Sequence, residues 1–160
     1  MSFYPLAGLI TISKRNQEMT DSEQYIEEPS GAITDTKSGL QWLPKDAKQD
    51  LGGWKNLAEA GAYARIMNQV YAGGCSDWRL PTLEEALSLY NKEVTQKDFE
   101  GKDIHISPLF VVSCAYKIWT SETNDEGKTC CLNLRTGEKE FLDKEEQENN
   151  SARLVRVKNP

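Results

Sequence analysis

At the centre of the chain stands the stretch Gly73-Gly74-Cys75-Ser76-Asp77-Trp78-Arg79-Leu80-Pro81-Thr82-Leu83-Glu84-Glu85. The glycine pair predicts the end of one helix, because glycine commonly follows a helix C-terminus. Leu80-Pro81 keeps the chain out of the helical region, since the residue before a proline is restricted to extended dihedrals. Thr82 predicts the start of a second helix, in which Glu85 reaches back to complete a capping box. The stretch therefore connects two helices.

The other residues of this stretch also have roles in folding. Trp78 is a large apolar side chain that favours a buried position. Arg79 is expected to pair with a carboxylate or a backbone carbonyl, because a partly buried guanidinium needs such partners. A helix cap and a buried ion pair account for Asp77, Trp78, Arg79, Thr82 and Glu85 without any ligand.

Apolar residues recur at helical spacing on both sides of the stretch. Upstream, residues 54–70 predict a helix of about four turns with one face packed inward. Its apolar face comprises Trp54, Leu57, Ala58, Gly61, Ala62, Ile66 and Val70. Downstream, the helix that begins at Thr82 has the apolar stripe Leu83, Ala86, Leu87 and Tyr90.

Short β segments flank the helical region. Before it, turns at 29–31 and 36–39 separate three predicted strands, at 25–26, 32–35 and 40–42. After it, a polar loop at 92–106 leads to predicted strands at 110–112, 116–120, 130–134 and 153–157. Two helices packed on an antiparallel sheet with long loops give an α+β fold class.

The length of 160 residues suits one domain with a core of its own. We expect an N-terminal extension or linker at 1–24 and the domain at 25–160. The extension has an apolar part, residues 3–12, which can pack on the domain or on a partner. The N-terminus lacks a basic region and a continuous apolar core of the kind that a secretory signal has, so we expect a cytoplasmic protein.

Charge excludes some classes of partner. The formal net charge is −6 and the sequence pI is about 4.9, and no run of Lys or Arg forms a basic patch. Such a field repels phosphate backbones, so we expect no nucleic acid and no membrane partner. The acidic run 143–148, in which only Lys144 carries the opposite charge, predicts a solvated loop.

Residues that could carry chemistry lack a supporting motif. Cys75, Cys114, Cys130 and Cys131 match neither a disulfide framework nor a zinc ligand set, so we expect reduced thiols and no metal or cofactor. Adjacent cysteines on a strand point to opposite faces. The single histidine, His105, has no motif for nucleophilic catalysis around it, and we expect no enzyme activity.

Four segments resemble one known family in order and spacing. The central stretch resembles the GG-x-SDWRLPT-x-x-EL signature of the DUF1566 family, also called the Legionella collagen-like protein C-terminal domain. The other three segments resemble its VTD-x-x-TGL-x-W opening, its Y-W-S-S strand and its closing V-R-x-V-R; they are residues 33–42, 118–121 and 153–156. The resemblance covers about residues 25–158.

This resemblance implies a C-type-lectin-like fold with a twisted antiparallel sheet. It also implies a relation to formylglycine-generating enzymes and to the variable proteins of diversity-generating retroelements, which differ in function. The residues that carry the signature are Trp42, Asp77, Trp78, Arg79, Thr82, Glu85, Trp119 and Arg156. The chain departs from the enzymes, because Cys130-Cys131 has no further cysteine downstream, and it lacks the Glu-Pro-Asn and Trp-Asn-Asp triplets of calcium-dependent lectins.

Function is expected in the loops, because a rigid scaffold with irregular loops is the usual form of a recognition module. The candidate loops are residues 44–53, 91–107, 121–128 and 143–150. Phe99 and Ile104 are candidate interface anchors, with burial beneath the loop as an equal alternative for either. Carboxylates and an amide that suit a calcium ion or a sugar lie at 121–128, although their generic spacing favours a solvated turn; they are Glu122, Asn124, Asp125 and Glu126.

Two hypotheses of different classes follow. The first is a non-catalytic module for protein recognition, as a cytoplasmic accessory subunit of a larger bacterial defence or signalling assembly. The second is a carbohydrate-binding domain of the adhesin type, as secreted members of the family suggest. The acidic surface weighs against sulfated polyanions as ligands.

Overall fold

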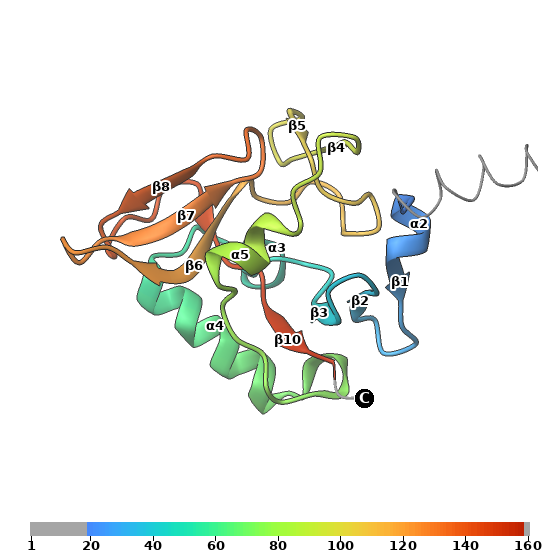
Figure 1. Cartoon of the computed structure of the whole chain (residues 1–160). Coiled ribbons are helices and arrows are strands. Elements are labelled where there is room, and N and C mark those ends of the chain that lie inside the picture. The colour runs from blue at the N-terminus through green and yellow to red at the C-terminus, as the bar shows by residue number, and fades with distance from the viewer. Residues whose placement is uncertain (1–18, 159–160) are drawn as a thin grey trace, which may run out of the picture.

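The computed structural model describes residues 19–158 and has mixed α+β architecture (Figure 1). In chain order, the elements are α2 (Asp21–Gln24), β1 (Tyr25–Glu27), β2 (Ile33–Asp35), β3 (Leu40–Trp42), α3 (Ala47–Leu51), α4 (Leu57–Gln69), η1 (Ala72–Gly74), α5 (Leu83–Leu87), β4 (Gln96–Lys97), β5 (Asp103–Ile104), β6 (Lys117–Thr123), β7 (Thr129–Asn133), β8 (Lys139–Leu142), β9 (Asn150–Ser151) and β10 (Val155–Val157).

Two four-stranded sheets form the frame. The first has the order β1-β2-β3-β10 and is antiparallel, with Trp42 opposite both Ile33 and Val155. The second has the order β8-β7-β6-β9, in which β9 runs parallel to β6. Figure 1 shows these sheets on opposite sides of the molecule, with α5 between them. The expected α+β class is confirmed, while the finer C-type-lectin-like assignment stays a prediction.

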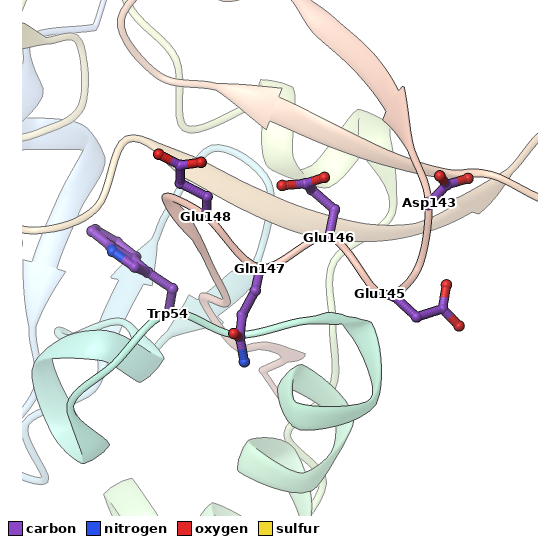
Figure 2. A pocket seen from close by; sticks show the side chains of 6 residues that line it. All are labelled: Trp54, Asp143, Glu145, Glu146, Gln147 and Glu148. Carbon is purple, nitrogen blue, oxygen red and sulfur yellow. The ribbon is translucent and has the colours of Figure 1, made fainter.

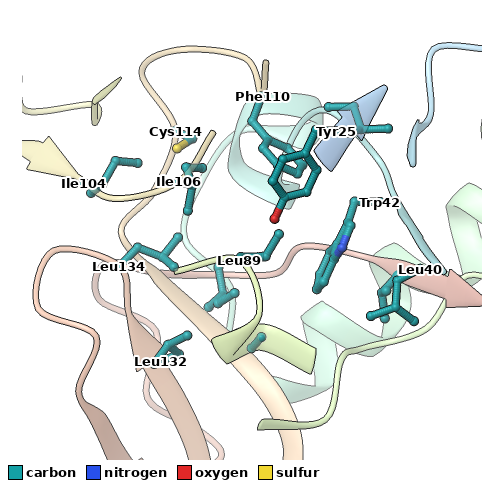
Figure 3. Close-up of a cluster of buried hydrophobic side chains, with 14 residues drawn as sticks. Tyr25, Leu40, Trp42, Leu89, Ile104, Ile106, Phe110, Cys114, Leu132 and Leu134 are labelled. Atoms are coloured by element: carbon teal, nitrogen blue, oxygen red, sulfur yellow. The ribbon is translucent and has the colours of Figure 1, made fainter. Parts of the chain in front are cut away.

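Two apolar clusters make up the core. The first joins both sheets to α5 and includes Tyr25, whose ring meets Phe110 edge-on at 5.9 Å (Figure 3). The second lies where α4 packs, around Tyr63, Trp78 and Trp119. Removing these large side chains from water is the main force that holds the helices to the sheets.

The N-terminal interpretation is tested only in part. Residues 1–18, including the apolar 3–12 part, lie outside the described residues. Within the predicted extension, Asp21–Gln24 forms the short helix α2, which Thr20 caps. The Ser107 hydroxyl donates to the Asp21 carboxylate at 2.7 Å, so α2 contacts the domain. The boundary at residue 25 stays a prediction.

The upstream helix is shorter than predicted and packs through a different face. It begins after Asn56, because Asn56 and Glu59 form a capping box, and Trp54 therefore lies outside it. Its buried residues are Ala60 and Tyr63. The predicted inward residues Ile66 and Val70 are 38% and 64% exposed, so the prediction for them is wrong. The predicted stripe omitted Tyr63, which is fully buried in the second core cluster.

The second helix agrees with the prediction at its start and differs at its end. Thr82 and Glu85 form the expected capping box. Ala86 is the buried residue of this helix and Leu89 is buried just after it, whereas Leu87 is exposed. The helix ends at Leu87, so Tyr90, the last residue of the predicted apolar stripe, lies outside it.

Predictions for the strands were partly wrong. Residues 110–112 do not form a strand, since Val111 and Val112 are exposed and the Val111 N–H donates to the Pro44 carbonyl at 3.1 Å. The predicted loop 92–106 contains the small β4–β5 ladder. The strands β8 and β9 were not predicted, because both are short and lack an alternating apolar pattern; they are recruited by their pairing with β7 and β6.

A buried polar cluster ties α3 to the C-terminal part of the chain. Asp46 caps α3, and its carboxylate also accepts hydrogen bonds from the Ala115 N–H at 2.7 Å and the Ser151 hydroxyl at 3.1 Å. The Arg153 guanidinium lies 3.8 Å from this carboxylate, and both side chains are fully buried. Because buried charges require such partners, the cluster fixes β9 and the chain just after residues 143–148.

Candidate functional site

The central stretch is held by contacts within the chain. Trp78 is buried, its indole N–H donates to the Ala72 carbonyl at 2.7 Å, and the Asn68 side chain pairs with its backbone at 2.7 and 2.9 Å. Arg79 is exposed and not partly buried as expected, yet it makes the expected pair, with two hydrogen bonds to Glu85 at 2.7 and 2.9 Å. This contact holds the pKa of Glu85 below its ordinary value.

The other signature residues tie distant segments together. Arg156 donates to Asp77 at 2.5 Å and also to Gln41, and its guanidinium lies 6.0 Å from the Trp78 ring. The Trp119 indole N–H donates to the Lys55 carbonyl at 2.8 Å. Since these side chains have partners inside the protein, the structure offers no ligand role for them.

The two predicted anchors differ in their surroundings. Ile104 is fully buried in β5 and belongs to the first core cluster, so its prediction as an interface anchor is wrong. The reason is its pairing with Gln96 across the β4–β5 ladder, which turns the side chain inward. Phe99 is half-buried, and its ring packs against Trp54 and Tyr116.

The residues predicted to bind a cation or a sugar lie at the end of β6 and in the turn of the β6–β7 hairpin. The Asn124 side chain accepts hydrogen bonds from the Glu126 and Lys128 N–H groups, at 3.1 and 2.9 Å, so it shapes the turn. Glu122, Asp125 and Glu126 are exposed. Across residues 19–158, no three His, Cys, Asp or Glu side chains are grouped to hold a metal ion.

The side chains that could carry out catalysis are the four cysteines and His105. All four cysteines are free thiols, and burial raises the pKa of Cys114, Cys130 and Cys131. The His105 ring meets Tyr90 edge-on at 5.6 Å, and its Nδ1 lies 2.9 Å from the Val94 carbonyl.

Within the described part of the chain, no helix has the length and apolarity to cross a membrane.

The structure does bring together one pocket that the sequence did not predict. It is open, has a volume of about 530 Å³, and lies between Trp54 and the acidic loop 143–148 (Figure 2). We call it the Trp54 pocket. Its walls are formed by Trp54, Asp143, Glu145, Glu146, Gln147 and Glu148. The Asn56 capping box could have revealed it, because that motif starts α4 after Trp54 and leaves this indole in a loop.

Trp54 begins a row of aromatic rings. Its ring centroid lies 4.8 Å from that of Phe99, edge-on, and the Phe99 ring is stacked with Tyr116 at 6.2 Å. Lys48 Nζ lies 4.7 Å from the Trp54 centroid and 5.3 Å from the Phe99 centroid. We call Trp54, Phe99 and Tyr116 the aromatic row. It joins loops that are far apart in the sequence.

The acidic loop is fixed by its backbone and leaves its carboxylates free. The Leu57 N–H donates to the Lys144 carbonyl at 3.0 Å, and the Gln147 side chain donates to Glu59 at 2.6 Å. Among the described residues, the carboxylates of the loop take part in no ion pair; they are Asp143, Glu145, Glu146 and Glu148. In Figure 2 the Glu146 and Glu148 side chains point to the same side of the loop. The pocket therefore combines an indole with uncompensated negative charge.

Comparison with known proteins gave one match. The family model described as the Lcl C-terminal domain matches residues 31–156. No curated protein and no solved structure matched the chain. The matched region includes the central stretch, the Trp54 pocket and nearly all of both four-stranded sheets. Of the two sheets, only β1 and the last residue of β10 lie outside it. The chain belongs to the Lcl C-terminal domain family, DUF1566, as its sequence motifs predicted.

Proposed function

We propose that the protein is a non-catalytic binding module that recognises another protein through the Trp54 pocket. The observation that carries this proposal is the half-buried Trp54 beside carboxylates that have no partner among the described residues. Trp42, Trp78 and Trp119 are buried in the core, so Trp54 alone offers an indole surface. Tryptophan beside complementary charge is a frequent centre of binding energy in protein interfaces.

The surroundings of the pocket support recognition by a preformed surface. The acidic loop is anchored to α4 by backbone and side-chain hydrogen bonds, and the cluster of Asp46 and Arg153 fixes the chain that follows it. A surface that is ordered before binding loses less conformational entropy on association. The net charge of −6 supports a protein partner over a polyanion.

Catalysis has less support. The cysteines other than Cys75 are buried, and His105 is held between Tyr90 and a backbone carbonyl; neither type of group lines the Trp54 pocket. The name of the family refers to a collagen-like protein, which favours a binding role. A cytoplasmic accessory subunit of a bacterial defence or signalling assembly is the form of this role that we propose.

Glycan binding is the second candidate, because of the same indole. An aromatic ring beside carboxylate and carboxamide oxygens can hold a sugar by stacking and hydrogen bonding. Gln147 and Glu148 supply such oxygens beside Trp54. A neutral glycan would suit this pocket better than a sulfated one, since the carboxylates repel sulfate.

Partner capture with matched charge variants tests the proposal. The tagged wild type is compared in host lysate with a pocket variant, Glu145→Lys, Glu146→Lys and Glu148→Lys. The control is a hairpin variant, Glu122→Lys, Asp125→Lys and Glu126→Lys. Each replacement changes the charge by two units, so both variants move the formal net charge from −6 to 0.

The two variants separate the outcomes. We expect a stoichiometric protein partner with the wild type and the hairpin variant, with and without a calcium chelator, and none with the pocket variant. A partner retained equally by all three proteins would show that the pocket is not the contact. Absence of any protein partner, with glycan binding that only the pocket variant loses, would favour the glycan candidate.

A further inference from the structure

The aromatic row already contains one complete arginine site. The Arg135 guanidinium lies 3.7 Å from the Tyr116 ring centroid, while its Nε and one terminal nitrogen each donate to a carboxylate at 2.7 Å, those of Asp98 and Glu100. An aromatic face and two carboxylates thus hold one guanidinium. This is the geometry that suits arginine, because its planar group can stack and form directional hydrogen bonds together.

The other end of the row has the same components without the arginine. Trp54 supplies the ring, and Glu146 and Glu148 supply carboxylates on one side of the acidic loop (Figure 2). Within residues 19–158 these carboxylates form no ion pair. Lys48 lies over both Trp54 and Phe99, and Trp54 also lines the pocket beside the loop.

Asn150 supports the loop from behind. It is fully buried, and its side-chain nitrogen donates to the Glu146 carbonyl at 3.3 Å. The backbone that carries the carboxylates is therefore held before a ligand binds.

We infer that the Trp54 pocket binds an arginine side chain from a basic, extended segment of the partner protein. The inference rests on the proposed function and names the chemistry of the ligand. Lysine would satisfy the charge of the loop, but as a compact point charge it would not stack and bridge two carboxylates at once. The pocket should therefore discriminate between two peptides of equal charge.

Calorimetric titration of the full chain provides the test. The probes are a short peptide of alternating arginine and serine and the same peptide with lysine. We expect the arginine peptide to bind about two- to fivefold more tightly, as a cation–π contribution at a half-exposed ring implies. Trp54→Leu should remove this preference. Because Trp54 is the one tryptophan of the chain's four that is not buried, the arginine peptide should also change the tryptophan emission of the wild type.

Variants in which amides replace carboxylates test whether any loss of negative charge weakens peptide binding. The pocket variant is Glu145→Gln, Glu146→Gln and Glu148→Gln, and the control is Glu122→Gln, Asp125→Asn and Glu126→Gln on the hairpin. Both lose three negative charges at exposed positions. We expect the pocket variant to bind the arginine peptide at least about tenfold more weakly, and the hairpin variant to stay within about twofold of the wild type.

Three results would overturn the inference. Equal affinity for the arginine and lysine peptides would show that only charge matters, and equal weakening in both neutral variants would show that the pocket is not the site. A change in tryptophan emission with calcium chloride at matched ionic strength, but not with the arginine peptide, would indicate a cation site. If the charge-reversed pocket variant still loses the partner in these cases, the proposed function stands without the arginine.

Discussion

The glycine pair of the central stretch offers a sharp test of how rigidly Trp78 is held. Gly73 and Gly74 are adjacent and both have a positive φ, of 61° and 78°. A Cβ on Gly73 would lie 3.2 Å from Cζ2 of Trp78 and 3.5 Å from the Cβ of Ala32, whereas a Cβ on Gly74 would have no atom within 4 Å. The two alanine variants therefore share the backbone strain and differ in the steric contact.

The expected losses follow from these contacts. Alanine in the left-handed region costs about 1 kcal/mol, which is the full expected effect of Gly74→Ala. In Gly73→Ala, the new methyl group must also displace Trp78, which is held by hydrogen bonds to Ala72 and Asn68. Overpacking of this kind costs roughly 1–3 kcal/mol more. Gly73→Ala should thus lose about 2 kcal/mol more than Gly74→Ala.

Urea unfolding of both variants and the wild type measures the difference. In a chain of this length about 2 kcal/mol corresponds to a gap of roughly 4–8 °C in Tm, so thermal unfolding checks the result. Equal losses in the two variants would refute the reasoning, because they would mean that Trp78 yields without cost. A loosening change, Asn68→Ala, should narrow the gap if the hydrogen bonds to Trp78 are what hold it.

Two further predictions concern titratable groups. Because Arg79 lowers the pKa of Glu85 from its ordinary 4.5, their pair stabilises the fold above that pH and loses its effect as the pH falls through the lowered pKa. Glu85→Gln, which keeps the cap, should cost about 0.5–1 kcal/mol at neutral pH and nothing in strong acid; a loss that persists in acid would contradict the role of the charge. A thiol-reactive aromatic disulfide should modify only the half-buried Cys75 in the native protein at neutral pH and all four cysteines after unfolding, since burial raises the pKa of the other three. The reaction is measured by absorbance. If more than one thiol reacted rapidly in the native protein, the prediction would be wrong, and the core would have to open readily.

Short-range patterns predicted the elements whose signals lie within a few residues. The capping box of Thr82 and Glu85 and the pair of Arg79 and Glu85 span three to six positions, so their geometry is fixed locally. The prediction failed where packing decides. The polar run around Ile104 left both an exposed anchor and a buried residue open, and pairing across the β4–β5 ladder turns the side chain into the core.

The candidate site was predictable only in its parts. The acidic loop was expected to be solvated, and its residues 143–148 are exposed. Phe99 was named as an anchor and lies in the aromatic row next to the pocket. Trp54 was assigned to a helix core on its apolar spacing, whereas the Asn56 capping box starts α4 after it.

The sequence alone determined the family, the fold class, the end of the first helix and the start of the second, because caps, turns and the residue before a proline act over a few bonds. Tertiary structure alone decided the pocket. Trp54, Phe99, Tyr116 and the loop 143–148 are distant in sequence, and they meet only because α4, the hairpins and the buried pair of Asp46 and Arg153 place them together. Such contacts depend on the burial of side chains from the whole chain, which no local pattern records.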